Sequence, residues 1–479
     1  MTDPLTARHR TLRLTAATAG TALVAALVAP PAALAHGIAQ REDLPIPQWL
    51  FAWGAAVVLV VSFVALGVLW PRPRLEAAGE RRVAQVPAAA EVLAGLAGIA
   101  VFAFSVYVGF AGVQTASANL LPTMVFVIFW VGIPFATLLL GDVWRAFSPW
   151  LAVARGAAWV TRRTGIDTPV PLAYPRRLGH WPAAAGILAF AWVELVYTNR
   201  DDPSTLAILA LAYAAVQLVG MSLYGIRAWT DHADAFAVYF GLFSRLSPLH
   251  WRERRLYVRP LLSGATALRP IAGTLALLFV MIGSTSFDGL SNGSVWTDAA
   301  EPPLQRFFSN LGLGPEHAVE AAYTVGLLAV VGVVAGLYLA GVNGMRSVGR
   351  SRSTQELARR FAHTLIPIGL AYVVAHYFSL LAYQGQAVAY LTSDPLGTGA
   401  DLLGMSTWTI NYNVVGANGI WYVQVAALVA GHIAGLTLAH DRALITYRKV
   451  RDATRSQYWM LAIMVAFTSL GLWLLSAQS

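Results

Sequence analysis

Long apolar stretches separated by short polar segments dominate the chain. Ten of them are long enough to cross a hydrocarbon core of about 30 Å as helices. They lie at about 49–70, 88–110, 120–141, 182–198, 204–226, 270–285, 319–342, 361–391, 420–440 and 457–476. The pattern predicts an all-α fold, a polytopic integral membrane bundle of about ten transmembrane helices. The eighth stretch is long enough to tilt or bend.

A further apolar stretch near the N-terminus has the order of a secretory signal peptide. Its parts are a basic region (Arg8, Arg10, Arg13), an apolar run (Leu14 to Val28), a proline pair (Pro30, Pro31) and a small-residue site (Ala33-Leu34-Ala35). We expect a signal peptide at 1–35 and a single membrane domain at 36–479. An uncleaved first membrane helix is the alternative, but the proline pair would interrupt it.

The basic residues are distributed as this topology requires. Of the 33 lysines and arginines, 27 lie in five alternate connecting segments, three in the signal peptide and three in the opposite segments. The five segments are 71–87, 142–181, 227–269, 343–360 and 441–456. Because basic residues accumulate in short cytoplasmic loops, we expect a bacterial cytoplasmic membrane protein with the mature N-terminus and the C-terminus outside.

Composition supports this class and excludes others. Residues of the AVILMFWYC set make up 57% of the chain and charged residues only 12%, far from the balance of soluble domains. The net charge of +9 follows from the topology and from contact with anionic lipid headgroups, so no nucleic-acid partner is expected. The absence of cysteine excludes thiolate metal sites and disulfides.

Two connecting segments on the outer side are longer than the rest. They cover 286–318 and 392–419 and combine Gly, Asn, Ser and Thr with aromatic residues, which predicts ordered caps over the bundle. On the inner side, Asp231 and Asp234 bracket the start of an apolar stretch at 235–246. We expect an N-cap, followed by an acid in the first turn of a helix that lies on, or dips into, the inner leaflet.

Ionisable residues inside apolar stretches are functional candidates, because burying them in lipid is costly. Glu194 lies in the fourth stretch, His363 and His376 in the eighth, and His432 and His440 in the ninth. Hydrogen bonding between helices is the simpler interpretation of these residues. The alternative is a polar cavity in which Glu194, His376 and His432 carry out catalysis.

Imidazole and carboxylate also suit transition metals. His376, His432 and Glu194 could therefore hold one divalent transition metal, with His440 and His363 as further candidate ligands. Two stacked haems are disfavoured, because the paired histidines are 13 residues apart in one stretch and eight in the other. No nucleotide-binding or zinc-peptidase motif occurs in a usable context.

Several short motifs resemble a family of polytopic bacterial membrane proteins commonly labelled fenitrothion hydrolase. They are His36-Gly37, Asp43-Leu44-Pro45-Ile46-Pro47, Gly141-Asp142-Val143-Trp144-Arg145, Ser148-Pro149-Trp150, Asp234-Ala235-Phe236-Ala237-Val238-Tyr239-Phe240-Gly241, Ser286-Phe287-Asp288-Gly289-Leu290, Ala375-His376-Tyr377-Phe378, Gly431-His432 and Ala439-His440-Asp441-Arg442. The resemblance implies hydrolysis of a lipophilic phosphotriester and assigns no catalytic residues.

Three functions follow as hypotheses. The first is a membrane-embedded hydrolase of a lipophilic ester or phosphotriester, in which a His-bound metal could activate water. The second is a permease for a small solute or ion, favoured by Pro134 and Pro367, which interrupt apolar stretches. The third is a metal- or haem-binding redox or metal-handling protein. In each case the partners are the lipid bilayer and a small lipophilic or ionic substrate.

Overall fold

The computed structural model describes residues 48–166, 169–348 and 352–477. The predicted signal peptide at 1–35 and the motifs at 36–47 lie outside these ranges.

Helices form at all ten predicted apolar stretches. The long ones are α2 (Gln48–Leu69), α3 (Ala88–Ala111), the continuous segment α4–η2–α5 (Leu120–Pro122, Thr123–Gly132, Ile133–Leu140), α8 (Trp181–Leu195), α9 (Pro203–Tyr224), α13 (Thr274–Ser291), α15 (Pro315–Met345), α17 (Leu365–Gln384), α19 (Ala417–Thr446) and α21 (Tyr458–Ala477). By length and composition, seven helical segments of the described ranges can cross a membrane. The fold is thus a helical bundle of the multi-pass membrane type, and the total of ten spans stays a prediction.

Shorter elements connect the long helices. They are η1 (Ala116–Ala118), α6 (Val143–Phe147), α7 (Pro149–Thr164), α10 (Ile226–His232), α11 (Ala235–Ser244), α12 (Ser263–Thr266), η3 (Val295–Ala300), α14 (Glu301–Asn310), α16 (Thr354–Phe361), η4 (Ala362–Thr364), α18 (Ala387–Ser393) and α20 (Val450–Ser456). The predicted outer cap at 286–318 is thus mostly helical, because α13 extends into it and η3 and α14 follow.

The predicted span at 361–391 is not one helix. It begins in the η4 turn, continues as α17 and breaks before α18. A Cβ atom at Gly385 would lie 2.3 Å from the carbonyl oxygen of Leu381, so the chain turns at a position that tolerates only glycine. On either side of the break, Tyr383 donates a hydrogen bond to the Val415 carbonyl (2.6 Å), and Gln386 exchanges hydrogen bonds with the backbone of Asn411. These bonds fasten the cap at 392–419 to α17.

A small antiparallel sheet, absent from the sequence prediction, marks one end of the bundle. It consists of β1 (Arg81–Gln85), β2 (Leu249–Arg252) and β3 (Arg255–Val258) in the order β1-β3-β2. Glu253 and Arg254 form the two-residue turn between β2 and β3 with φ of 51° and 59°, as hairpin turns require. The strands are too short and too polar to give an alternating apolar pattern, so the sequence carried no signal for them.

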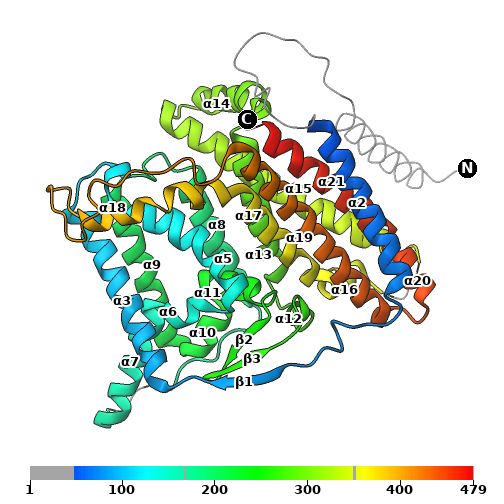
Figure 1. The fold of residues 1–479 in the computed structure, drawn as a ribbon, viewed down its shortest axis with the longest axis horizontal. Coiled ribbons are helices and arrows are strands. Elements are labelled where there is room, and N and C mark those ends of the chain that lie inside the picture. The colour runs from blue at the N-terminus through cyan, green and yellow to red at the C-terminus, as the bar shows by residue number, and fades with distance from the viewer. Residues whose placement is uncertain (1–47, 167–168, 349–351, 478–479) are drawn as a thin grey trace, which may run out of the picture. The chain divides into compact units, whose positions relative to one another are not determined.

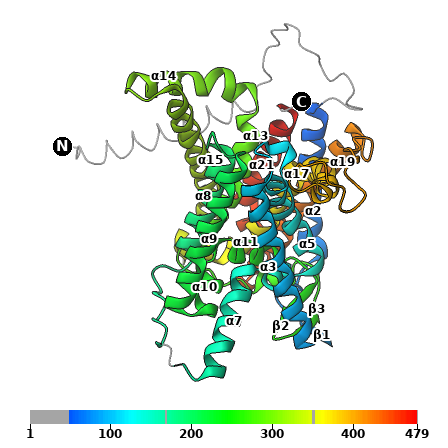
Figure 2. The same cartoon turned by 90° about the vertical axis from the view of Figure 1, so that its left-hand side faces the viewer.

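The connecting elements are divided between two ends of the membrane bundle (Figures 1 and 2). We call them the sheet end and the α14 end. The sheet end carries β1–β3 with α6, α7, α10, α12, α16 and α20, which come from the five segments rich in basic residues. The α14 end carries α14, α18 and the polar cap that follows α18.

The centre of the bundle contains the short apolar helix α11. Asp234, which we expected in the first turn, is instead its N-cap, and its carboxylate accepts a hydrogen bond from the Ala237 N–H (3.2 Å). The leaflet position was wrong: α11 is buried and packs against α5, α8 and α17. Asp231 belongs to the preceding helix α10, and its carboxylate forms an ion pair with Arg145. Aromatic rings fill the surrounding space, including Trp130, which stacks on Tyr239 at 5.0 Å.

Candidate functional site

Helices α8, α13 and α17 bring ionisable side chains together inside the bundle. An apolar cluster of Leu195, Phe287, Trp296 and Leu327 joins α8 and α13 to η3 and α15. The residue beside Leu195 is Glu194, and the residue after Phe287 is Asp288. Because neighbouring helical positions point about 100° apart, burial of the two apolar residues turns the two acids away from this cluster.

Four side chains form what we call the carboxylate cluster: Glu194, Asp288, His376 and Tyr377. Nε2 of His376 lies 2.7 Å from Oδ2 of Asp288. The Tyr377 hydroxyl donates to the same Oδ2 atom at 2.7 Å, and its oxygen lies 3.4 Å from Oε1 of Glu194. The order of contacts is therefore Glu194, Tyr377, Asp288, His376.

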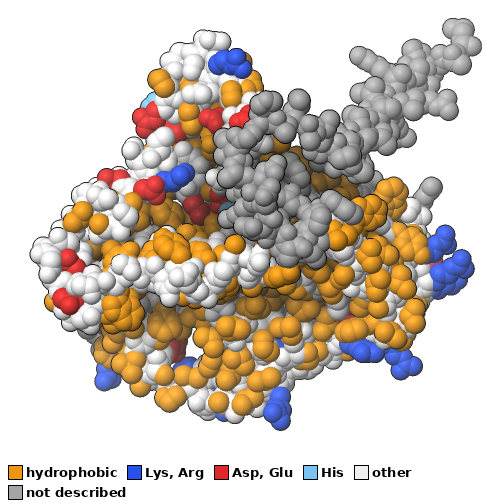
Figure 3. All heavy atoms as spheres, turned by 45° about the horizontal axis from the view of Figure 1, so that its top comes forward, with side chains coloured by type: hydrophobic (Ala, Val, Ile, Leu, Met, Phe, Trp, Pro, Cys, Tyr) orange, Lys and Arg blue, Asp and Glu red, His pale blue; other side chains and the backbone are white. Residues whose placement is uncertain are grey.

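The cluster is sheltered but accessible. The side chains of His376 and Asp288 are 13% and 15% exposed, whereas Tyr377 is buried. The indole of Trp130 lies near Glu194 and Tyr377, but its Nε1 atom is buried and forms no hydrogen bond. The space-filling view brings the α14 end forward and shows several acidic side chains on that face, between apolar surfaces (Figure 3). Through His376 and Asp288 the cluster keeps partial contact with the solvent.

The charges of the cluster are only partly balanced. Arg200, in the connection after α8, interacts electrostatically with both Glu194 and Asp288, but its side chain is 44% exposed. Two carboxylates that share one hydroxyl repel each other when both are ionised, and a proton held between them removes the repulsion. This arrangement can therefore bind and release protons.

Two residues of the cluster were missed from the sequence. In the sequence, Tyr377 stands out only as part of a motif, and Asp288 falls in the predicted outer cap because the apolar stretch ends near 285. The available signal was the absence of proline between 271 and Asn292-Gly293.

His432 does not belong to the carboxylate cluster. Its Nδ1 atom bonds to the Leu428 carbonyl oxygen (2.8 Å), and its ring lines a separate cavity against α21. The predicted metal ligands His376, His432 and Glu194 are therefore divided between two places. Within the described ranges, no group of three or more His, Asp or Glu residues is arranged to hold a metal ion. A shared divalent metal does not fit this donor set.

His440 and Asp441 hold the connection after α2. Nε2 of His440 lies 3.0 Å from the Trp70 carbonyl oxygen. The Asp441 carboxylate accepts hydrogen bonds from Trp70 Nε1 (2.8 Å) and from the backbone N–H groups of Arg74 and Glu76 (both 2.7 Å). The motif around His440 therefore stabilises the connection after α2.

His363, the remaining candidate ligand, is fully buried in the η4 turn. Its ring lies near the guanidinium group of Arg442 and the Leu438 backbone on α19. A nearby cation does not favour binding of a second cation, so His363 is a poor metal ligand in this position.

A second charged network lies toward the sheet end. Arg145 pairs with Asp142 (3.1 Å) and Asp231 (2.6 Å). Burial raises the pKa of Asp142, and the neighbouring Arg145 opposes this rise. The carboxylate of Asp234 accepts hydrogen bonds from Trp150 Nε1 (2.7 Å) and from the Tyr213 hydroxyl (2.9 Å). These acids are balanced by cations and donors, unlike those of the carboxylate cluster.

Comparison of the chain with protein-family models, with curated proteins and with solved structures found no match. The carboxylate cluster is therefore the strongest indication of function.

Proposed function

We propose that the protein is a proton-coupled permease for a small solute or ion, with the carboxylate cluster as its proton-binding centre. The observation that carries this proposal is the Tyr377 hydroxyl between Glu194 and Asp288, with His376 on the far side of Asp288. Series of Asp, Glu and His side chains within membrane helices are typical of proton relays in pumps and transporters.

The helices around the cluster support a transport pathway. Helix α8 has 15 residues and is about 22 Å long, shorter than a hydrocarbon core of about 30 Å, and Glu194 lies at its end. Helices α10 and α11 are separated at Ala233 and Asp234. Interrupted helices at membrane depth are tolerated where they are buried in protein or line a cavity, and they surround the binding sites of many transporters.

The proposal includes an orientation. The basic segments at the sheet end favour the cytoplasmic side for that end. The carboxylate cluster then opens toward the outside of a bacterial cytoplasmic membrane, where protons and solute would enter together.

Proton flux into proteoliposomes tests the proposal. The full-length protein is reconstituted with a pH-sensitive dye inside, and a potassium diffusion potential is imposed. Amino acids, sugars, alkali cations and organic cations are then added in turn. We expect at least one class to drive internal acidification, and Glu194→Gln to reduce it ~10- to 100-fold, because the amide cannot exchange a proton.

The matched control is Glu301→Gln in the first turn of α14, which should behave as the wild type. Equal acidification in wild type and Glu194→Gln would remove the cluster from the mechanism. Solute uptake that is independent of the pH gradient in the wild type would reject proton coupling.

A hydrolase is the second candidate, favoured by the contact between His376 and Asp288. A carboxylate bound to one ring nitrogen orients an imidazole so that the other nitrogen can take a proton from water. This use of the residues requires no metal and agrees with the resemblance to the fenitrothion hydrolase family. Release of nitrophenolate from fenitrothion by the purified protein, lost in His376→Gln, would support it. Absence of release by the wild type would reject it.

A further inference from the structure

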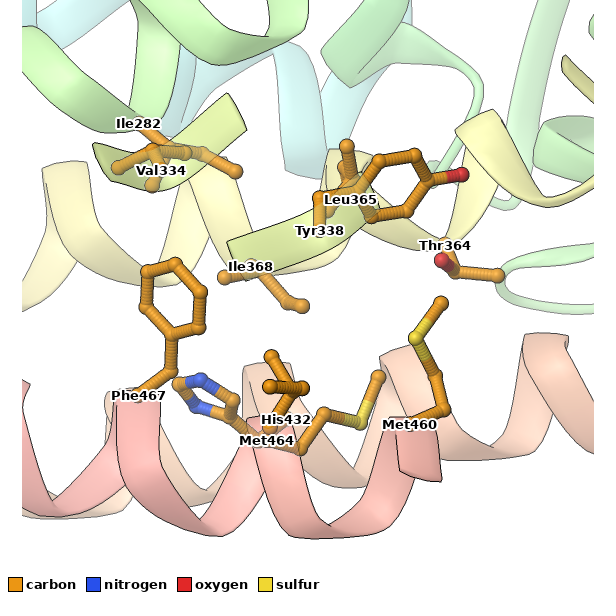
Figure 4. A pocket seen from close by; sticks show the side chains of 11 residues that line it. Ile282, Val334, Tyr338, Thr364, Leu365, Ile368, His432, Met460, Met464 and Phe467 are labelled. Atoms are coloured by element: carbon orange, nitrogen blue, oxygen red, sulfur yellow. The ribbon is translucent and has the colours of Figure 1, made fainter. Parts of the chain in front are cut away.

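The cavity beside His432 is unsuited to a polar ligand. It measures about 20 Å³ and its lining is apolar, with Leu365 and Ile368 on one side and Met460 and Met464 on the other (Figure 4). One water molecule would fit by size, but apolar cavities stay dry. The small sheet at the sheet end has the opposite chemistry.

The two faces of this sheet differ. Residues paired across neighbouring strands lie on the same face, and successive residues of a strand alternate between faces. Leu249 pairs with Val258, and Trp251 pairs with Leu256, so these four apolar residues share one face. Trp251 donates a hydrogen bond to the Leu140 carbonyl at the end of α5 (2.6 Å). The apolar face is therefore the one that faces the bundle.

The other face is basic, and we call it the arginine face. Tyr257 lies at its centre, paired with Arg82 on β1 and with His250 on β2. On the same face, Arg255 pairs directly with Arg252. Cζ of Arg252 lies 4.8 Å from the centre of the Tyr257 ring. Like charges directly opposite each other destabilise a sheet, so the arginine face favours an anion between them.

One carboxylate balances part of this charge. Glu80 lies 2.8 Å from Nδ1 of His250 and forms an ion pair with Arg252 at 3.2 Å. Arg82 donates to the neutral amide oxygen of Gln85 at 2.9 Å. Three arginines thus face one carboxylate.

The phenol at the centre of the arginine face responds to this excess of positive charge. The guanidinium groups of Arg252 and Arg255 near its hydroxyl lower the pKa of Tyr257. A lowered pKa means that the surroundings favour the anionic form of the group. An anionic ligand would benefit in the same way.

The sheet lies close to a membrane-spanning helix. Gln85, the last residue of β1, precedes Ala88, the first residue of α3, by three positions, and α3 can cross a membrane. On the apolar face, Trp251 and Val258 are still 40% and 38% exposed. Tryptophan is enriched where a membrane meets water. A sheet with one apolar and one basic face at this position fits the layer of lipid headgroups.

We propose that Arg82, Arg252 and Arg255 bind the phosphate group of an anionic phospholipid. Guanidinium groups bind phosphate through paired N–H donors, and a bound phosphate removes the repulsion between the two opposed arginines. The site is separate from the carboxylate cluster and does not depend on proton transport.

Competition between two phospholipids tests this proposal. The purified full-length protein is titrated in detergent with phosphatidylglycerol or phosphatidylcholine, and native mass spectrometry measures the dissociation constant of the tightest-bound lipid. We expect the wild type to prefer phosphatidylglycerol. The double variant Arg82→Gln/Arg255→Gln should bind phosphatidylglycerol ~10- to 30-fold more weakly and phosphatidylcholine as the wild type does. Both arginines are exposed, so the variant should fold.

The matched control is Arg448→Gln/Arg451→Gln, which removes the same charge from exposed positions at and before α20. It should keep the wild-type affinity. Equal affinity in the wild type and Arg82→Gln/Arg255→Gln would overturn the proposal, and so would an equal loss in both double variants, since net charge alone would then explain the binding. Displacement of phosphatidylglycerol by an equal concentration of glycerol 1-phosphate would reject a lipid in favour of a soluble phosphate.

Discussion

Oδ2 of Asp288 lies 2.7 Å from Nε2 of His376, although 88 positions separate the two residues in the chain. Each lies in an apolar helix, where a single charge would be costly. The contact lets one compensate the charge of the other, so the burial of each side chain depends on the other. The Tyr377 hydroxyl extends this dependence to Glu194.

Replacement of Asp288 by asparagine tests this dependence. The amide keeps the shape of the side chain but can neither hold a negative charge nor exchange a proton. We expect Asp288→Asn to lower solute-driven proton uptake ~10- to 100-fold in proteoliposomes. In infrared spectra, the pH-dependent carboxyl signal of the cluster should also change. Asp298→Asn, in η3, is the control and should leave both measurements unchanged.

Two tyrosine-to-phenylalanine variants on α17 should distinguish an effect on proton uptake from an effect on stability. Tyr377→Phe removes the donor that lies between Glu194 and Asp288, and we expect proton uptake to fall about tenfold. The free energy of unfolding should fall by ~1–3 kcal/mol, the usual value for a hydrogen bond to a charged group. Tyr372→Phe, on the same helix, loses a hydrogen bond to the Phe467 carbonyl and should reduce stability but not uptake. Equal uptake in the two variants would contradict a role for Tyr377.

The helices could be predicted from the sequence, but the end of α13 could not. Hydropathy falls at Gly283, which suggested the end of a span. The helix nevertheless continues to Ser291, and its polar side chains are satisfied within it: the Ser286 hydroxyl donates to the Ile282 carbonyl oxygen at 2.8 Å. A hydropathy scale does not account for such hydrogen bonds within a helix, so it predicts a loop at Asp288.

The separation of His376 from His432 could not be predicted either. Both residues lie at similar depth in helices that pack against each other. The packing occurs at Ala371, whose Cβ would lie 2.2 Å from a Cβ at Gly431. His376 follows Ala371 by five residues and is turned about 140° around α17, toward Asp288 on α13. His432 is adjacent to Gly431 and lies in the cavity against α21. The depth of a residue in the bundle can be predicted from hydropathy. The neighbour toward which its side chain points is decided by how the helices pack.

The motif that contains Asp441 should be required for stability and not for proton uptake. Asp441→Asn loses the charge that three donors from the α2–β1 connection share. We expect the free energy of unfolding to fall by ~3 kcal/mol. Thermal unfolding in detergent measures the loss, and uptake per folded molecule should stay at the wild-type level. Asp452→Asn, in the first turn of α20, is the control. A specific loss of uptake at full stability would assign Asp441 to the function instead.

The environment of His180 predicts that stability decreases in acid. His180 precedes α8, the helix that carries Glu194, and its Nδ1 atom lies 3.0 Å from the Thr274 hydroxyl oxygen. Burial, reinforced by the nearby His232, lowers the pKa of His180 from 6.5 to about 4. Between these values the unfolded chain binds a proton that the folded chain does not, so stability is complete above 6.5 and falls as the pH approaches 4.

The contribution of His180 is at most about 3 kcal/mol, from 1.36 kcal/mol for each pKa unit. His180→Gln cannot titrate, so the decrease in melting temperature between about pH 7.5 and about pH 5 should be smaller in this variant than in the wild type. His317→Gln is the control, because the His317 side chain is 72% exposed, and it should keep the wild-type decrease. An unchanged decrease in His180→Gln would show that other groups set the acid sensitivity of the bundle.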